Sequence, residues 1–304
     1  MDATNLWLTT PCGARQSLYA CLKMGMHGDP LRTDTACLQR VSALGRIAVD
    51  RSAGRTRLAR LYEEGAAKIR LPKVDGDPLE AILINTAGGL TGGDRLAWEV
   101  AVGPDAAAVL TTQACEKAYR SAGGTADIAC TLRVEAGGSL AWLPQETIVY
   151  EGSALRRRFE IDLAAGARLL MVEATVFGRL AMGERTQSAL FRDRWRVRCA
   201  GRLVHAEDLA LGPALAPTLA GTAATAGAPV VATVLLMDEV AGELRDQARA
   251  IVGETGGVSV WSVAGSGKLL ARLVAEDSYT LRRRLVPLLE LLNGWAGLPK
   301  AWSL

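Results

Sequence analysis

The glycine-rich segment 85–96 constrains the fold more than any other part of the sequence. It contains two Gly-Gly pairs and ends on Asp94, Arg95 and Leu96. Glycine at this density holds a backbone that side chains would forbid, with positive φ or with another strand in close contact. Strand-like segments flank it at 79–84 and 96–102. The sequence predicts a shaped turn between two strands that fixes the Asp94 carboxylate, although a common glycine-rich bend with a solvated Asp94 is an alternative.

Period-two alternation continues through much of the chain. Residues 159–163 and 168–173 alternate between apolar and polar side chains. Between positions 192 and 198 every second residue is an arginine, with Trp195, Val197 and Cys199 among them. Side chains two apart lie on the same face of a strand, so we expect the guanidinium groups on one face and the apolar groups on the other. Short alternating strands between glycine turns are typical of a predominantly β fold.

The pattern changes near residue 230. Residues 213–229 read as a loop, and the apolar run 230–237 suits a strand that is covered on both faces. A helix follows, capped by Asp238 and ended by Gly253. Two strands are expected at 257–264 and 268–275, then a last helix that packs on the body, with Ser278 as its cap and a kink or restart at Pro287.

Composition narrows the classes of function. The chain has 304 residues, of which 49% are hydrophobic, so it can bury a sizeable core. A net charge of +3 is too small to favour nucleic acid, and we find no apolar run of membrane-spanning length. We see no secretory leader and expect a cytoplasmic protein. Residues 1–40 lack periodicity and are predicted to be a poorly ordered extension before a single domain at 41–304.

Metal-binding and catalytic motifs are scarce. The two histidines are His27 and His205, and the six cysteines include no C-x-x-C pair, so we expect reduced thiols and no tightly bound cofactor. The run Gly265–Lys268 lacks the spacing of a phosphate loop and is predicted to be a hairpin turn. No Gly-x-Ser-x-Gly motif occurs. The sequence therefore does not favour an enzyme.

Five blocks in order carry a family resemblance. The first is the glycine-rich segment itself. Four more follow it: Leu110–Ser121 with its Lys-x-Tyr-Arg element, Leu140–Ile148, the Gly-Arg-x-Ala-x-Gly-Glu block at 178–184, and Leu298–Trp302. Together they resemble the urease accessory protein UreD family, also called UreH, from about Leu44 to the C-terminus. Cys115 and Glu116 depart from the small residues or Thr that are more usual there.

The resemblance implies a fold, partners and a cargo. The fold would be a right-handed helical stack of β-strands with two α-helices in the C-terminal part. The protein would be a scaffold that catalyses nothing, binds the urease apoprotein and recruits UreF and, through UreF, the GTPase UreG. Ni²⁺ would pass in transit toward the urease active site, without tight binding.

Isolated acids are the candidate groups for such a passage. Asp94, Glu173 and Glu207 lie in apolar or glycine-tight surroundings, with Glu184 as a fourth candidate. Buried carboxylates are costly unless they are paired or used. The plain alternative is structural ion pairing with arginines. Those arginines are Arg95, Arg120, Arg179 and Arg202.

Two rival functions stay open. One is an enzyme of unknown chemistry that uses an anion-binding or acid–base cluster. Its residues would be Asp94, Lys117, Tyr119 and Arg120. The other is an interaction module with no metal path. For the latter, the arginines of 192–198 with 156–158 form either a surface for an acidic partner or a solvated strand face.

Overall fold

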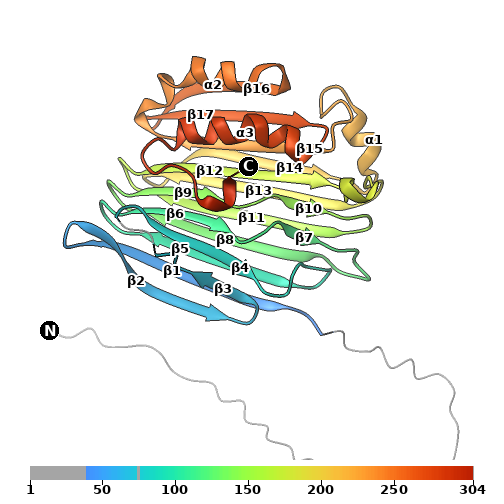
Figure 1. Cartoon of the computed structure of the whole chain (residues 1–304), viewed down its shortest axis with the longest axis horizontal. Coiled ribbons are helices and arrows are strands. Elements are labelled where there is room, and N and C mark those ends of the chain that lie inside the picture. Colours follow the sequence, from blue (N-terminus) through green and yellow to red (C-terminus); the bar gives the residue numbers. More distant parts are fainter. Residues whose placement is uncertain (1–38, 74–75, 304) are drawn as a thin grey trace, which may run out of the picture. The chain divides into compact units, whose positions relative to one another are not determined.

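A computed structural model describes residues 39–73 and 76–303. Apart from Gln39 and Arg40, the predicted extension at 1–40 lies outside the described residues. From β1 onward the chain is built mainly of strands, which form two sheets (Figure 1).

The first sheet, sheet A, has seven strands in the order β14-β13-β11-β8-β5-β1-β2. Their bounds are β1 Ser42–Ser52, β2 Arg55–Glu64, β5 Arg95–Val102, β8 Ala126–Val134, β11 Ala154–Leu163, β13 Leu190–Cys199 and β14 Arg202–Leu211. The strands from β1 to β13 in this sheet pair in parallel, whereas β2 and β14 close the two edges antiparallel.

The second sheet, sheet B, has the strand order β16-β17-β15-β12-β9-β6-β4-β3, and the short strands β7 and β10 pair beside β12. Their bounds are β3 Ala67–Arg70, β4 Leu79–Asn85, β6 Ala107–Thr112, β7 Glu116–Ala118, β9 Ser139–Leu143, β10 Thr147–Val149, β12 Arg168–Phe177, β15 Val230–Met237, β16 Gly256–Val263 and β17 Ser266–Ala275. Strands β4, β6, β9 and β12 are parallel neighbours.

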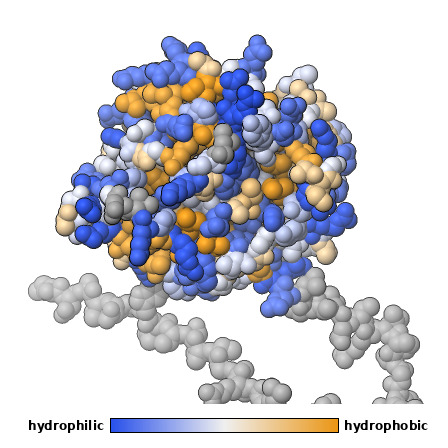
Figure 2. Space-filling view, viewed as in Figure 1, coloured by the Kyte–Doolittle hydropathy of each residue, from blue (hydrophilic) through white to orange (hydrophobic). Residues whose placement is uncertain are grey.

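From β4 to β13 the chain crosses repeatedly between the two sheets, so successive coils stack on one another. In Figure 1 the colours run in sequence order along this stack, from β1–β3 to β16 and β17. The predicted fold class, predominantly β with stacked strands, is confirmed. Hydrophobic residues on the visible surface form separate areas between hydrophilic ones (Figure 2).

Two neighbouring strands of sheet B, β6 and β9, are each interrupted and followed by a short strand, and these short strands pair with each other. β6 gives way to β7 across 113–115, and β9 gives way to β10 across 144–146. Before the breaks, Leu110 and Trp142 face the core between the sheets, whereas after them Ala118 and Val149 do. The inward positions therefore stay on even numbers across the β6–β7 break but change from even to odd numbers across the β9–β10 break.

The hydrophobic core has two layers. Between the sheets lie aromatic pairs such as Phe159 with Trp195, whose ring centroids are 5.9 Å apart. On the other face of sheet B, a second apolar cluster packs under the C-terminal helices. The α-helices are α1 Leu215–Ala220, α2 Arg245–Val252 and α3 Ser278–Leu292, and short 3₁₀ turns occur at η1 Leu180–Met182, η2 Glu239–Gly242, η3 Gly253–Thr255 and η4 Lys300–Trp302. The prediction that the last helix packs on the body is confirmed.

Local details correct three expectations. The predicted loop at 213–229 contains helix α1. Asp277, and not Ser278, caps α3, because its side chain accepts a hydrogen bond from the Thr280 backbone. Helix α3 also continues through Pro287 instead of restarting there. The hairpin expected at Gly265 is confirmed, since Ala264 and Gly265 both have positive φ between β16 and β17.

The glycine-rich segment is a tight turn, as predicted. Gly93 has φ +93°, and a Cβ on Gly92 would lie 2.0 Å from the Ser121 hydroxyl oxygen and 2.4 Å from the Gly123 carbonyl oxygen. Asp94 is 4% exposed, and its two carboxylate oxygens accept from the backbone N–H groups of Val41 and Thr91, each at 2.8 Å. Close backbone contact and this cap fix the turn.

Candidate functional site: an interior polar row

A row of polar side chains crosses the inner face of sheet B. Asn85 at the end of β4 donates to Glu116 on β7 at 3.1 Å, and Glu116 is the strand partner of Thr147 on β10. Thr147 neighbours Thr175 on β12, and Glu173 shares the Thr175 face two residues earlier. On the far side, Glu173 is paired in register with Thr233 on β15, and Thr233 with Arg272 on β17. We call these groups the interior polar row; they are Asn85, Glu116, Thr147, Glu173, Thr175, Thr233 and Arg272.

Arg157 joins this row to sheet A. Its guanidinium donates to both carboxylate oxygens of Asp193, at 3.1 and 2.6 Å, and to the Thr147 hydroxyl at 3.0 Å. It also forms a close ion pair with Glu173. The side chains of Arg157 and Glu173 are each 4% exposed and that of Asp193 is 7% exposed. A buried arginine therefore holds carboxylates from both sheets.

Two indole groups complete this centre. Trp142 Nε1 donates to Glu173 at 2.9 Å, and Trp195 Nε1 donates to Asp193 at 3.1 Å. Buried polar groups are stable only when they are hydrogen-bonded, and here each carboxylate has an indole and a guanidinium partner. When Glu173 and Asp193 are both ionised, the single positive charge of Arg157 balances only one of their two negative charges.

Burial sets the protonation of the acids. Burial raises the pKa of Glu173 to about 7, although Arg157 acts in the opposite direction. Burial likewise raises the pKa of Glu116 to about 7, against the hydrogen bond from Asn85. Both carboxyl groups therefore gain or lose a proton near neutral pH. At that pH, the change between the neutral and the charged form costs little free energy.

At the edge of the stack, the row meets β14. Arg272 Nη2 lies 2.7 and 2.5 Å from the two carboxylate oxygens of Glu207. His205 Nε2 is buried 3.9 Å from Glu207 and has no hydrogen-bond partner among the residues that the structure describes. Burial, together with Lys268 and Arg272, lowers the pKa of His205 to about 4, so its imidazole is neutral at pH 7. Neutral imidazole is the form that can bind a metal ion.

A second cluster brings the sequence motifs together at the surface. The Tyr119 hydroxyl donates to the Gly88 carbonyl at 3.2 Å, and the Tyr119 and Tyr150 rings meet edge to face at 5.2 Å. The Arg179 guanidinium lies 5.0 Å from the Tyr150 ring centroid and pairs with Glu184. The structure thus stacks three blocks that are far apart in sequence.

The predicted acids lie in different environments. Glu173 and Glu207 lie on or beside the interior polar row, whereas Asp94 caps the glycine turn and Glu184 belongs to the surface cluster. Arginine pairing was expected, and Glu184 does pair with Arg179. Arg157, placed by the sequence with the outward arginines, instead points inward and pairs with Glu173.

Three residues of the rival acid–base cluster make contacts with backbone groups. Asp94 binds backbone groups, while Tyr119 contacts Gly88 and Arg120 bridges to Ser153. Lys117 lies on β7, two residues before Tyr119 in the chain. In the part of the chain that the structure describes, no three His, Cys, Asp or Glu side chains gather as a metal site.

Sequence reasoning missed several members of the row and also Asp193, which binds Arg157 from sheet A. Glu116 was noted only as a departure from the family pattern, and Asp193 and the threonines were passed over. Asp193 carried a usable signal, because it occupies an inward position of β13 between Phe191 and Trp195. The threonines carried none, since Thr is common in any strand.

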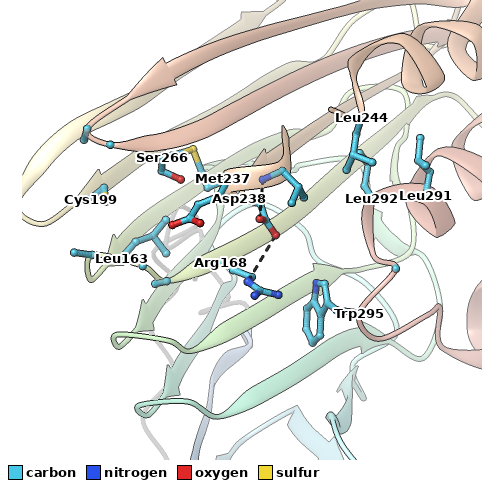
Figure 3. A pocket seen from close by; sticks show the side chains of 18 residues that line it. Leu163, Arg168, Cys199, Met237, Asp238, Leu244, Ser266, Leu291, Leu292 and Trp295 are labelled. Carbon is cyan, nitrogen blue, oxygen red and sulfur yellow. Dashed lines mark hydrogen bonds and ion pairs between the residues drawn. The ribbon is translucent and has the colours of Figure 1, made fainter. Parts of the chain in front are cut away.

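A hollow of about 650 Å³ lies near the C-terminal helices. Leu244, Leu291, Leu292 and Trp295 line it, and Figure 3 shows Arg168 extending toward Asp238, with which it pairs at 3.8 Å. Within residues 39–73 and 76–303, no helix has the length and apolar character needed to cross a membrane. Among the described residues, Cys115, Cys130 and Cys199 are free cysteines.

The fold and this row define a class of stacked-strand proteins with a line of polar side chains through the core. The family model described as UreD urease accessory protein matches residues 42–303. The chain is 58% identical over 267 residues to "Urease accessory protein UreD 1" of Brucella abortus, covering 88% of this chain and 95% of that protein. It is 59% identical over 266 residues to "Urease accessory protein UreD" of Mesorhizobium japonicum, with 88% and 95% covered. The chain belongs to the UreD family, whose members are accessory proteins of urease maturation and not enzymes.

Proposed function

We propose that this protein binds the urease apoprotein and recruits UreF and, through UreF, the GTPase UreG, and that Ni²⁺ in transit to urease follows the interior polar row. Membership of the UreD family supports the scaffold role. The nickel path is proposed because of the row itself: its carboxyl and hydroxyl groups cross an otherwise apolar core, with Asn85 at one end of the row and Arg272 at the other.

The chemistry of the row suits transit. Carboxylate and hydroxyl oxygens hold Ni²⁺ more weakly than several imidazoles or thiolates would. Glu173 and Glu116, with pKa values of about 7, can each release a proton as a cation arrives and take it back as the cation leaves. At Glu207, the neutral His205 imidazole adds a nitrogen ligand within 3.9 Å of the carboxylate.

The four candidate acids take different roles in this proposal. Glu173 and Glu207 contact the cation directly. Asp94 acts on delivery through the glycine turn, because its carboxylate is already bound to two backbone N–H groups. Glu184 acts through the surface cluster with Arg179. In the rival reading, a metal-independent interaction module, none of these acids affects nickel.

The test replaces Glu173 and Glu207 together with Gln. The nickel content of urease matured in cells is measured, together with co-purification of the variant with urease and UreF. We expect nickel content to fall while co-purification persists, since Gln preserves shape. A matched control replaces Glu160 and Asp162, which lie on the outer face of β11, with Gln and Asn. Equal nickel loading by parent, test and control variants, at matched protein levels, would favour the metal-independent module.

A further inference from the structure

The outer face of sheet A carries a block of four arginines. Arg156 and Arg158 on β11 pair in register with Arg192 and Arg194 on β13, and all four side chains are exposed. Neighbouring strands are ~4.8 Å apart and alternate residues ~6.6 Å apart, so the four guanidinium groups rise from one small rectangle. We call it the arginine block. It borders a hollow of about 510 Å³.

Most of this positive charge is not neutralised. Asp127 on β8 binds Arg156 at 2.5 and 3.0 Å. Asp208 on β14 is the register partner of Arg194, but its carboxylate pairs with Arg196. Among residues 39–73 and 76–303, no carboxylate lies within ion-pair distance of Arg158, Arg192 or Arg194.

Like charges directly opposite one another destabilise a sheet. The neighbouring outer positions are small, since Arg158 lies beside Ala129 and Arg192 beside Ala210. Small side chains therefore flank the arginine block at two of its four corners, which leaves Arg158 and Arg192 accessible to a ligand. An anionic ligand would remove the mutual repulsion of the guanidinium groups.

We propose that the arginine block binds an acidic segment of a partner protein in extended conformation. A strand that lies along β11 and β13 presents every second side chain at ~6.6 Å, which matches the spacing of the arginines along each strand. Arginine binds carboxylates in bidentate geometry, as Arg156 already does with Asp127.

The surroundings favour a protein over a nucleic acid. The block ends at Asp127 on one side and at Asp208 on the other, and Glu160 and Asp162 follow along β11. A nucleic acid backbone needs a positive surface that continues past such acids. A few carboxylates fit within the block without meeting them.

The test uses a synthetic ten-residue peptide in which Glu and Thr alternate. Binding to the full chain is measured by fluorescence anisotropy at several salt concentrations. The test variant replaces Arg158, Arg192 and Arg194 with Gln, and the control variant replaces Arg55, Arg57 and Arg60 of the exposed strand β2 with Gln, an equal change in charge. We expect affinity to fall about tenfold in the test variant and less than about twofold in the control.

Further ligands separate the remaining outcomes. A peptide with Gln in place of Glu should not bind. Absence of binding by the Glu peptide, or equal loss in both variants, overturns the proposal. Tighter binding of a thymidine oligonucleotide of equal charge, lost in the same test variant, also overturns it and assigns the block to nucleic acid. Because the readout is direct binding, the result is independent of nickel delivery.

Discussion

At the scale of single residues, Arg157 is the group on which the interior depends most. It binds Glu173 from sheet B and Asp193 from sheet A, and its side chain is 4% exposed. Loss of one partner from a buried ion pair leaves an uncompensated charge, at a cost of ~3–5 kcal/mol. Replacement of Arg157 would therefore damage the fold and could not report on nickel delivery. Glu173→Gln avoids this problem because Arg157 keeps the Asp193 carboxylate, and Glu207→Gln avoids it because the Arg272 side chain is 55% exposed.

Glu116 gives a residue-scale prediction about pH. Its pKa is raised from 4.5 to about 7, so the folded protein keeps a proton that the unfolded chain releases between these values. Its contribution to stability is fully present below pH 4.5 and is lost as pH rises through 7. We expect Glu116→Gln to gain stability relative to the parent over this range, by roughly 3 kcal/mol. Urea unfolding of both proteins from pH 5 to 8 measures the difference, and parallel stability curves would contradict it.

At the scale of the elements, the glycine turn before β5 has no room for side chains. A Cβ on Gly92 would lie 2.0 Å from Ser121 and 2.6 Å from the Gly124 carbonyl oxygen. We expect Gly92→Val to cost roughly 4 kcal/mol or more, because backbone would have to move. The soluble yield of the variant is the measurement.

Gly242 provides the control for this turn. A Cβ there meets nothing within 4 Å, and its φ is not positive. Gly242→Ala should therefore leave the yield unchanged. Parental yield and melting temperature for Gly92→Val would show that the turn is not tightly packed.

An ion pair links helix α3 to sheet B, beside the apolar contacts of the second core cluster. Arg282 binds Glu146 in the β9–β10 break at 2.7 and 2.8 Å, and the Glu146 side chain is 2% exposed. Arg282→Gln leaves this carboxylate buried without its cation, so we expect a loss of ~3 kcal/mol in the free energy of unfolding. Arg283→Gln on the exposed side of the same helix is the control. Equal denaturation midpoints for both variants would rule out this role for the pair.

At the scale of the whole molecule, the family match begins at residue 42. Residues 1–38 lack apolar periodicity and lie before that match. We predict that a chain without them still activates urease, because the strands and helices that form both cores come later. Urease activity in cells, at equal levels of the two chains, is the measurement. Loss of activation at matched expression would assign a function to these residues.

The sequence was sufficient for the architecture but not for the interior polar row. Alternation between Arg192 and Cys199 correctly predicted which side chains of β13 face out, because that information is local. The inward direction of Arg157 was missed, although the alternation of Phe159, Ile161 and Leu163 along the same strand carried this signal. The pairing of Glu116 with Thr147, and of Glu173 with Thr233, depends on registers between strands that are far apart in the chain.

The aligned breaks in sheet B have an evolutionary consequence. The number of residues in each break sets which residues of the following strand face the core: the parity of the core-facing residues is kept across 113–115 and reversed across 144–146. Deletion of one residue from 113–115 would turn Glu116 and Ala118 outward and Lys117 inward. We therefore expect the residues of the two breaks to vary in type within this family. Insertions and deletions there should be rare, unless neighbouring strands change length together.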